Sequence, residues 1–433
     1  MLDLCLISPP RLYLVDPMAQ AHLGLMYLGA AAERAGLAVS IANMLCPDDI
    51  DNLPPARCYG ITGTYLDVPA INDLAAVLCQ KGKVVVGGPV NLTAHMLDAR
   101  SVSTVVVGDG DALLEQLVEA DTPWLLSGER AERCPGEWPA RHLWPGPLGG
   151  AIFASGHYFP GGSTSIQGSS GCPYSCAFCA GPSLTPRRVV HREASDIVAE
   201  MEHCVERMGI RQFRFNDEHA TANRSYAIDL AARIVRSKPL GHGRGIAWRI
   251  SAAPIPNDVA LFHALRGAGC REISFGVESA DPQVLRVLRC HKGSPREVRL
   301  AISRARAAGI TTRALLIVGA PGTTPTTGAL NKAFIESSGV DNVAITLFYP
   351  LPGSAVAAEP EAFGCRIRPG IDNASFYAYG PAGRNDLTPT IEIEGMSYDD
   401  LKLQVAQTID VAEATGKLTS RRHYESTRPS SIA

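Results

Sequence analysis

The sequence predicts an α/β protein that contains two parallel sheets and ends in a small helical segment. Short β-rich runs alternate with amphipathic helical patterns over residues 1–120, and the same alternation resumes over 163–355. Strands that alternate with crossover helices form parallel sheets, because a parallel pair needs a long connection. Three cysteines at the spacing Cys-x3-Cys-x2-Cys stand near the start of the second series. We therefore expect two domains, joined by a linker over 121–162 and followed by a C-terminal cap and tail over 356–433.

Composition favours a small-molecule ligand over a macromolecular one. Hydrophobic residues make up 46% of the 433 residues, which suffices for packed cores, and the net charge of −3 gives no basis for nucleic-acid binding. No apolar run approaches the roughly 18 residues of a membrane-spanning helix, and Met1–Ile7 has the pattern of a strand rather than a signal peptide. Twelve cysteines without an export signal are typical of a reducing compartment. The sequence thus predicts a cytoplasmic protein without nucleic-acid or membrane partners.

The first domain is expected to be a doubly wound, Rossmann-like parallel sheet of five strands. The expected strands are Leu2–Ile7, Ala38–Ala42, Tyr59–Thr62, Val84–Gly87 and Thr104–Val107, and the expected helices are Leu23–Ala35, Val68–Gln80 and Ala112–Ala120. Such sheets bind ligands at the carboxyl ends of their strands, where Gly87-Gly88-Pro89 and Gly108-Asp109-Gly110-Asp111 stand. No G-x-G-x-x-G follows the first strand and no Walker A sequence occurs, so the pattern does not favour dinucleotide or nucleoside triphosphate binding.

The linker and the C-terminal segment carry no catalytic motif. Residues 121–162 are rich in proline and glycine and contain Trp124, Trp138 and Trp144, so we expect an ordered surface linker anchored by indole rings. The last segment contains one clear helix, Tyr398–Ala414, with Ser397 as its N-cap and Gly416 as its C-cap. The tail beyond Ser420 is polar, and we expect it to be frayed.

The second domain is expected to be a six-stranded, partial version of the eight-stranded TIM-type barrel, a (β/α)6 arrangement. The expected strands are Ser163–Gln167, Gln212–Phe215, Ile246–Ile250, Glu272–Val277, Thr312–Val318 and Asn342–Phe348. Active residues of such barrels sit at the carboxyl ends of the strands. Polar or glycine-rich clusters follow several of these strands, including Asp217-Glu218-His219 and Gly319-Ala320-Pro321-Gly322.

Cys172, Cys176 and Cys179 lie within one loop and supply three thiolates. Iron–sulfur clusters are usually held by four thiolates, so a three-cysteine loop leaves one iron open for chemistry. A structural zinc site normally has four ligands, often in two Cys-x2-Cys pairs, and no second pair lies near in the sequence. A disulfide would leave one of the three cysteines over. The spacing therefore favours an iron–sulfur cluster over zinc or a disulfide.

The cysteine loop, with Phe178 just before the third cysteine, resembles the cluster loop of the radical S-adenosylmethionine (SAM) family. The strand-end clusters resemble those of the same family, over about residues 163–355. The resemblance implies a [4Fe-4S] cluster whose open iron binds SAM, cleavage of SAM to a 5′-deoxyadenosyl radical, and a flavodoxin- or ferredoxin-type electron donor. It also implies contacts from Phe178 to adenine, from Arg249 and Ser251 to the SAM carboxylate, and from Glu278 to the ribose or the methionine amine. The cofactor-binding residues implied in this way are Phe178, Arg249, Ser251, Glu278, Ser279, Gly319, Pro321 and Gly322.

The first domain resembles the cobalamin-binding domain that precedes the barrel in many radical SAM enzymes. The helix start Leu23–Leu28 and the turn Gly108–Asp111 carry this resemblance. The Asp-x-His-x-x-Gly sequence that supplies an axial histidine in other cobalamin proteins is absent. Two alternatives follow: the domain binds cobalamin without that histidine ligand, or it has kept the fold and lost the cofactor.

Two reactions fit this domain combination, and the sequence favours dehydration. Asp217, Glu218 and His219 stand at one strand end and offer the acid and base that radical dehydration of a vicinal diol needs. With the short C-terminal segment, they suggest a resemblance to the aminoglycoside diol-dehydratase group of apramycin-type antibiotic biosynthesis, which implies an amino-sugar substrate and a downstream reductase. The alternative is cobalamin-dependent C-methylation of an unactivated carbon. A third alternative is a non-catalytic iron–sulfur or ligand-sensing protein.

Overall fold

The computed structural model describes residues 1–12, 20–129, 134–149, 162–255, 258–291, 293–370 and 388–419. The expected frayed tail and part of the expected linker lie outside these residues. The chain divides into two compact units, Met1–Gly149 and Gly150–Ala433, which are described in turn. No helix within the described residues is long and apolar enough to cross a bilayer.

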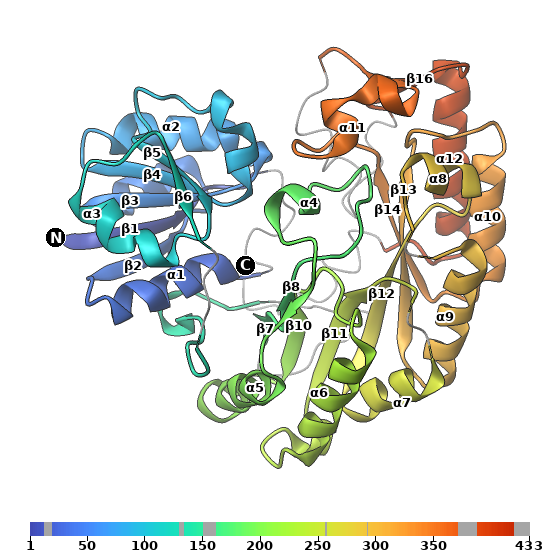
Figure 1. Cartoon of the computed structure of the whole chain (residues 1–433), viewed down its shortest axis with the longest axis horizontal. Helices are drawn as coiled ribbons and strands as arrows, with labels where there is room; N and C mark the ends of the chain where they lie inside the picture. The colour runs from blue at the N-terminus through green and yellow to red at the C-terminus, as the bar shows by residue number, and fades with distance from the viewer. Residues whose placement is uncertain are drawn as a thin grey trace. The chain divides into compact units, whose positions relative to one another are not determined.

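The first unit is a parallel sheet of six strands in the order β2-β1-β3-β4-β5-β6 (Figure 1). Its strands are β1 Leu2–Ser8, β2 Val39–Asn43, β3 Ala56–Thr62, β4 Lys83–Gly87, β5 Thr104–Gly108 and β6 Leu125–Gly128. Its α-helices are α1 Leu23–Arg34, α2 Val68–Leu78 and α3 Leu114–Glu119. The parallel α/β architecture is confirmed, but the count of five strands is wrong. The sixth strand lies in the range expected to be linker, where four residues among prolines and glycines give too short an apolar pattern to recognise.

Helices cover both faces of this sheet, as the doubly wound prediction requires. Leu4 and Leu6 of β1 belong to an apolar core shared with α1 and α3. Cys5 and Ile7, which alternate with them, belong to a second core shared with α2. Side chains alternate across a strand, so one apolar run serves two cores. Trp144 is 7% exposed and packs in the first core, as expected for an indole anchor.

The second unit contains a parallel sheet of six strands in the order β14-β13-β12-β11-β10-β7. Its strands are β7 Ser163–Ile166, β10 Gln212–Phe215, β11 Ala247–Ala252, β12 Cys270–Glu278, β13 Thr311–Val318 and β14 Asn342–Leu347. The helices between them are α5 Ala194–Met208, α6 Arg224–Arg236, α7 Val259–Gly267, α8 Pro282–Val287, α9 Pro295–Ala307 and α10 Thr327–Ser337. Figure 1 shows α5, α6, α7 and α9 along the outside of the curved sheet. The six-stranded partial barrel is thus confirmed.

Several short elements complete the chain. The sequence did not predict the hairpin of β8 Ser169–Ser170 and β9 Val190–His191, nor α4 Gly181–Leu184, α8, α11 Ala355–Ala358, or the antiparallel pair β15 Cys365–Ile367 and β16 Ile391–Ile393. The 3-10 helices are Pro47–Asn52, Tyr65–Asp67, Pro89–Met96, Asp111–Leu113, Arg141–Leu143, Gly241–Gly243 and Pro360–Phe363.

The C-terminal helix α12 Tyr398–Ala414 has the predicted bounds and N-cap, but its C-cap is Thr415, one residue before the predicted Gly416. The Ser397 hydroxyl accepts the Asp400 N–H at 3.1 Å, and Gly416 has a φ of 66°. α12 docks against α10, where the Gly328 N–H donates to Gln404 Oε1 at 2.7 Å. A side chain at Gly328 would lie 2.4 Å from Gln407 Oε1, so glycine permits this close approach.

Candidate iron–sulfur and cofactor sites

The cysteine loop is fixed at its start by the hairpin β8–β9. The Cys172 N–H donates to Pro186 O at 3.1 Å. Gly171 has a φ of 97°, and a Cβ there would lie 2.2 Å from Arg188 O. Only glycine tolerates both this conformation and this contact. Gly171 therefore lets the two arms of the hairpin close just before the first cysteine.

The middle of the loop docks on two short helices that the sequence did not predict. The Ala177 N–H donates to Leu288 O at the end of α8, at 2.8 Å, and the Val356 N–H of α11 donates to Ala177 O at 3.1 Å. Phe178 is partly buried against an apolar cluster that includes Val284, Leu288 and Phe348. Backbone hydrogen bonds and apolar packing thus hold the segment between the second and third cysteines.

None of the three cysteines forms a disulfide, and their chemistry fits a three-cysteine cluster. Cys176 is 4% exposed, whereas Cys172 and Cys179 are partly exposed. The Gly181 N–H donates to Cys179 Sγ at 3.3 Å, a contact that favours a thiolate or a cluster sulfur. No three His, Cys, Asp or Glu side chains within the described ranges gather as they would around one metal ion. Each cysteine of a cluster binds a different iron, so its thiols do not have to meet at one ion.

Asp217 accepts hydrogen bonds from the segment that leads into the cysteine hairpin. The Gly168 N–H donates to its Oδ1 at 2.8 Å, and the Ser169 hydroxyl donates to its Oδ2 at 2.6 Å. Asp217 is 6% exposed, and burial raises the pKa of its carboxyl to about 6. The hydrogen bonds lower this pKa, but burial has the larger effect. The two oxygens of this predicted acid–base residue therefore bind the loop after β7 and the first residue of β8, respectively.

Glu218 and His219 also contact the surroundings of the cysteine loop. The Gly171 N–H donates to Glu218 Oε2 at 3.1 Å. His219 is 3% exposed, its Nδ1 accepts the Ala253 N–H at 3.3 Å, and its ring stacks on Tyr174 with 6.0 Å between centroids. The structure thus brings the three predicted acid–base residues together as supports around the cysteine loop. Their role in proton transfer stays a prediction.

Arg249 and Ser251 lie on the same face of β11, because side chains alternate along a strand. The Arg249 guanidinium lies 3.4 Å from Glu272 Oε1, and the Glu272 side chain is 1% exposed. A buried carboxylate of this kind needs a cation, so the ion pair gives Arg249 a structural role whether or not SAM is bound. Its contact with the SAM carboxylate stays a prediction.

Glu278 ends β12 in a conformation that non-glycine residues rarely adopt. Its φ is 61°, it is 7% exposed, and the pairing of β12 with β13 shifts register between Gly276 and Glu278. Strained backbone of this kind clusters at functional sites, and the bulge re-aims the side chain. Ser279 next to it has a structural place: its hydroxyl donates to Asn331 Oδ1 at 3.4 Å and accepts the Asp281 N–H at 3.1 Å.

The Gly319–Gly322 turn is shaped by packing against neighbouring helices. Gly319 has a φ of 70°, and a Cβ there would lie 3.2 Å from Val405 of α12. Gly322 has a φ of 85°, and a Cβ there would lie 2.8 Å from Val287 of α8. These contacts explain both glycines, so the predicted approach of this turn, including Pro321, to adenosine remains a separate expectation.

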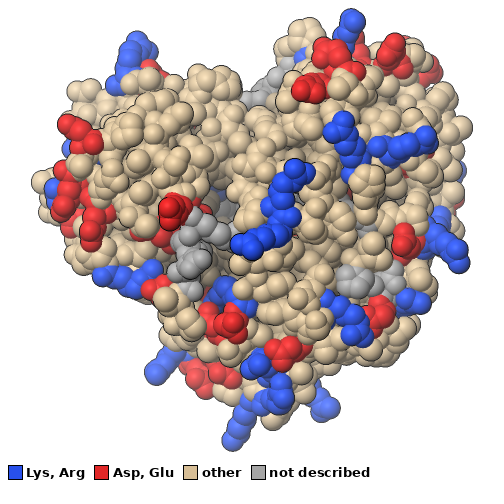
Figure 2. Space-filling model, viewed as in Figure 1, with Lys and Arg blue, Asp and Glu red and all other residues tan. Residues whose placement is uncertain are grey.

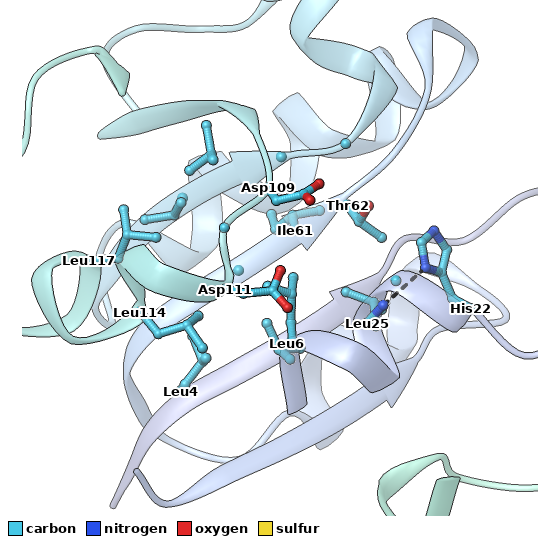
Figure 3. A pocket seen from close by; sticks show the side chains of 18 of the residues that line it. Leu4, Leu6, His22, Leu25, Ile61, Thr62, Asp109, Asp111, Leu114 and Leu117 are labelled. Carbon is cyan, nitrogen blue, oxygen red and sulfur yellow. Dashed lines mark hydrogen bonds between the residues drawn. The ribbon is translucent and has the colours of Figure 1, made fainter. Parts of the chain in front are cut away.

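The first unit has an apolar cavity of about 270 Å³ at the edge where the sequence predicted ligand binding. Leu4 and Leu6 of β1, with residues of β3, β4 and β5, form its floor. Leu25 of α1 and Leu114 and Leu117 of α3 form its sides (Figure 3). The turn Gly108-Asp109-Gly110-Asp111 also lines the cavity. Such a slot between a sheet and two helices suits a flat apolar group with polar contacts at its rim.

His22 lines the same cavity and was not singled out from the sequence. It caps α1, where the Leu25 N–H donates to its Nδ1 at 3.3 Å (Figure 3). Burial, helped by the nearby Arg11 guanidinium, lowers the pKa of the imidazole to about 4. A neutral imidazole whose Nδ1 accepts a hydrogen bond carries its proton on Nε2. In this tautomer the Nε2–H of His22 can donate a hydrogen bond to a ligand in the cavity.

Comparison with protein families defines the class. Residues 166–327 match the family model described as "Radical SAM superfamily". This range begins at the end of β7, includes all three cysteines of the loop and ends at the start of α10. The chain therefore contains a radical SAM domain, and enzymes with this domain use a [4Fe-4S] cluster and SAM.

Several relatives in sequence are named as methyltransferases. An uncharacterized methyltransferase of Pyrococcus horikoshii is 25% identical over 68% of this chain and 67% of its own length. Hopanoid C-2 methylase of Rhodopseudomonas palustris is 30% identical over 43% of this chain and 36% of its own length. A tryptophan 2-C-methyltransferase of Streptomyces laurentii is 27% identical over 30% of this chain and 22% of its own length. The chain thus spans from about a fifth to two thirds of these relatives.

Solved structures share the fold across both units. The radical SAM methyltransferase TsrM from Kitasatospora setae, solved with cobalamin and a [4Fe-4S] cluster, has a TM-score of 0.69 at 17% identity and covers 96% of this chain and 91% of its own. The cobalamin-dependent radical SAM enzyme OxsB has a TM-score of 0.60 at 13% identity over 96% of this chain and 58% of its own. The fold of each unit therefore resembles that of the corresponding part of TsrM and OxsB.

Proposed function

We propose that this chain is a cobalamin-dependent radical SAM enzyme that transfers a methyl group to a carbon atom of a small-molecule substrate. The observation that carries the choice of reaction is the apolar cavity of about 270 Å³ in the first unit. Radical dehydration needs no cobalamin, whereas methylation of an unactivated carbon does. A ready-made apolar cavity in a chain that also contains a radical SAM domain therefore favours methylation.

The residues present fit the three cofactors. Cys172, Cys176 and Cys179 would hold the cluster, with the Gly181 N–H on the third sulfur. The cavity suits one apolar ring system, such as the benzimidazole of cobalamin, and His22 Nε2–H is a donor within it. When bound, the cluster and SAM supply the radical, and cobalamin supplies the methyl group. The protein's own part is to hold these groups, exclude water and orient the substrate.

The Asp217, Glu218 and His219 contacts weaken the dehydration hypothesis. Dehydration needs an acid and a base that reach the substrate. The carboxylates of Asp217 and Glu218 accept backbone or hydroxyl hydrogens beside the cysteine loop, and His219 Nδ1 accepts a backbone N–H. We infer that the three are positioning residues for the loop. An amino-sugar substrate, a role in antibiotic biosynthesis and a downstream reductase therefore lose their support, and the relatives' names add none.

A basic loop beside the cysteines suits an acidic electron donor. Arg187 and Arg188 are exposed on the return arm of the hairpin, and Arg187 donates to the Ser175 hydroxyl inside the cysteine motif. Figure 2 shows basic side chains gathered over α4 and the chain that follows it. Complementary charge steers encounter between partners. We infer that a flavodoxin or ferredoxin docks here in the cytoplasm, where a low-potential donor is maintained.

Product mass tests the reaction. The chain is purified anaerobically, reconstituted with iron, sulfide and cobalamin, and given SAM carrying a deuterated methyl group, a reductant and an extract of candidate metabolites. Methylation predicts products that gain a labelled methyl group, together with bound cobalamin. A product lighter than its substrate by the mass of one water, formed by protein that has bound no cobalamin, would instead restore the dehydratase hypothesis.

A further inference from the structure

The inner face of the second sheet carries a layer of polar side chains in register across four strands. Ser251 of β11 pairs with Ser274 of β12, Ser274 with Arg313 of β13, and Arg313 with Asn342 of β14. Paired residues of adjacent strands lie about 5 Å apart and point to the same face. The opposite face, with residues such as Phe275, is buried and apolar. The layer therefore lines the inside of the partial barrel, on the same face as Arg249.

Arg313 is a buried cation without a partner within the described ranges. It is 8% exposed, and its Nε is buried without a hydrogen bond. No hydrogen bond or ion pair of its guanidinium to a described residue is found. Burying a charge is costly unless it is paired. The barrel therefore holds a guanidinium that no carboxylate of the described residues neutralises.

The carboxylates nearest along these strands are already engaged. Glu272 pairs with Arg249 at 3.4 Å. Asp341 precedes Asn342, and its carboxylate accepts hydrogen bonds from Thr312 at 2.8 and 2.9 Å and from Arg306 at 3.1 Å. Arg214, in register with Arg249, adds a further cation to the inner face. On this face of β10 to β13, cations outnumber carboxylates, since Arg214, Arg249 and Arg313 share the face with Glu272.

We propose that Arg313 binds an anionic group of the substrate, a carboxylate or a phosphate, inside the barrel. The inference rests on the proposed function and narrows its substrate class. Leu315, Ile317 and Ala344 follow on the same face towards the carboxyl ends of the strands and are partly exposed, so they can contact an apolar body. The substrate is therefore an acid with an apolar portion. A polycationic amino sugar would be repelled by Arg313.

A stability measurement tests the site without knowledge of the ligand. Arg313→Met replaces the unpaired guanidinium with an apolar chain of similar length, so we expect an unchanged or raised melting temperature. The matched variant Arg249→Met leaves the buried Glu272 without its cation and is expected to lower the melting temperature by several degrees. A drop for Arg313→Met as large as that for Arg249→Met would show that Arg313 is structural and would overturn the proposal.

A binding measurement tests the anion. The reconstituted full chain with SAM is titrated calorimetrically with 3-phenylpropanoate, its neutral amide and inorganic phosphate. We expect about ten- to a hundredfold preference for an anion over the amide, lost in Arg313→Gln and kept in the exposed control Arg233→Gln. The two anions separate carboxylate from phosphate recognition. Equal affinities for the acid and the amide overturn the proposal. So does an Arg313→Gln variant that loses affinity for SAM but keeps the preference for the anion over the amide. Neither binding result depends on methylation, so this proposal and the proposed function fail separately.

Discussion

The two units hold ligands by different physical means. The cavity of the first unit is built from leucines of a sheet and two helices, and shape and apolar contact define it. The cysteine loop of the second unit and the segment before it are held by hydrogen bonds to the carboxylates of Asp217 and Glu218 and with backbone groups of α11 and the end of α8. Apolar contact tolerates small rearrangements, whereas a network of directed hydrogen bonds does not. We therefore expect ligand binding by the first unit to be sensitive to changes in side-chain volume. Ligand binding by the second unit should be sensitive to the loss of single polar contacts.

Removal of a cysteine should have the largest effect on activity, and it should affect cofactor binding in the second unit only. Replacement of Cys172, Cys176 or Cys179 by alanine should abolish cluster assembly and SAM cleavage, because no spare thiolate replaces the missing ligand. Cobalamin binding by the first unit should persist. Iron content, the visible spectrum and 5′-deoxyadenosine formation measure these outcomes. Cys134→Ala, at an exposed position, is the control. A cysteine-loop variant with full iron and turnover would refute the site.

Filling the cavity of the first unit should weaken cobalamin binding and leave the iron–sulfur cluster intact. Leu117→Trp adds an indole to the cavity wall, and we expect at least about a tenfold loss of cobalamin affinity while the cluster and its spectrum remain. Val77→Phe, on the exposed side of α2, is the matched control for adding a ring. Cobalamin retention measured by spectroscopy after gel filtration distinguishes them. Unchanged retention in Leu117→Trp would place cobalamin elsewhere.

Asp217 separates a positioning role from a proton-transfer role. Asparagine can still accept the Gly168 N–H and can donate to the Ser169 hydroxyl, whereas alanine can do neither. We expect Asp217→Asn to keep the cluster and turnover, and Asp217→Ala to lose most of both. If Asp217 were the catalytic acid, Asp217→Asn would keep the cluster and lose turnover.

The pH dependence of stability follows from the same carboxyl. Its pKa in the folded chain is about 6, above the ordinary aspartate value of 3.8, because burial disfavours the charged form. Between these values the folded state binds more protons than the unfolded state, so Asp217 makes stability fall as pH rises from about 4 to 6. The fall should be at most about 3 kcal/mol. Denaturant unfolding of the wild type and Asp217→Asn at pH 4.5 and 6.5 measures it: the wild type should lose stability relative to Asp217→Asn.

Local patterns sufficed for most of the fold. A strand-length apolar run predicted β10 with its observed bounds, and capping residues helped to predict those of α12. Both signals could be recognised because burial and capping act over a few residues. The strand β6 and the helices α8 and α11 were missed, since short elements owe their structure to tertiary contacts. The cysteine loop could be recognised from spacing alone. The contacts of Asp217 with Gly168 and Ser169 could not, because they join segments 48 and 49 residues apart.

Charge reversal in the basic loop should have the smallest effect, and it should slow reduction by a protein electron donor only. The double substitution Arg187→Glu and Arg188→Glu reverses the charge beside the cysteine motif, so we expect reduction by a flavodoxin to slow several-fold at low salt and less at high salt. Reduction by dithionite, which needs no docking, should keep its wild-type rate. Arg233→Glu with Arg236→Glu on α6 is the charge-matched control. Arg187 also contacts Ser175, so Ser175→Ala reports the effect of losing that contact without a change in charge. Equal slowing with both reductants would show that the loop supports the cluster and does not dock the donor.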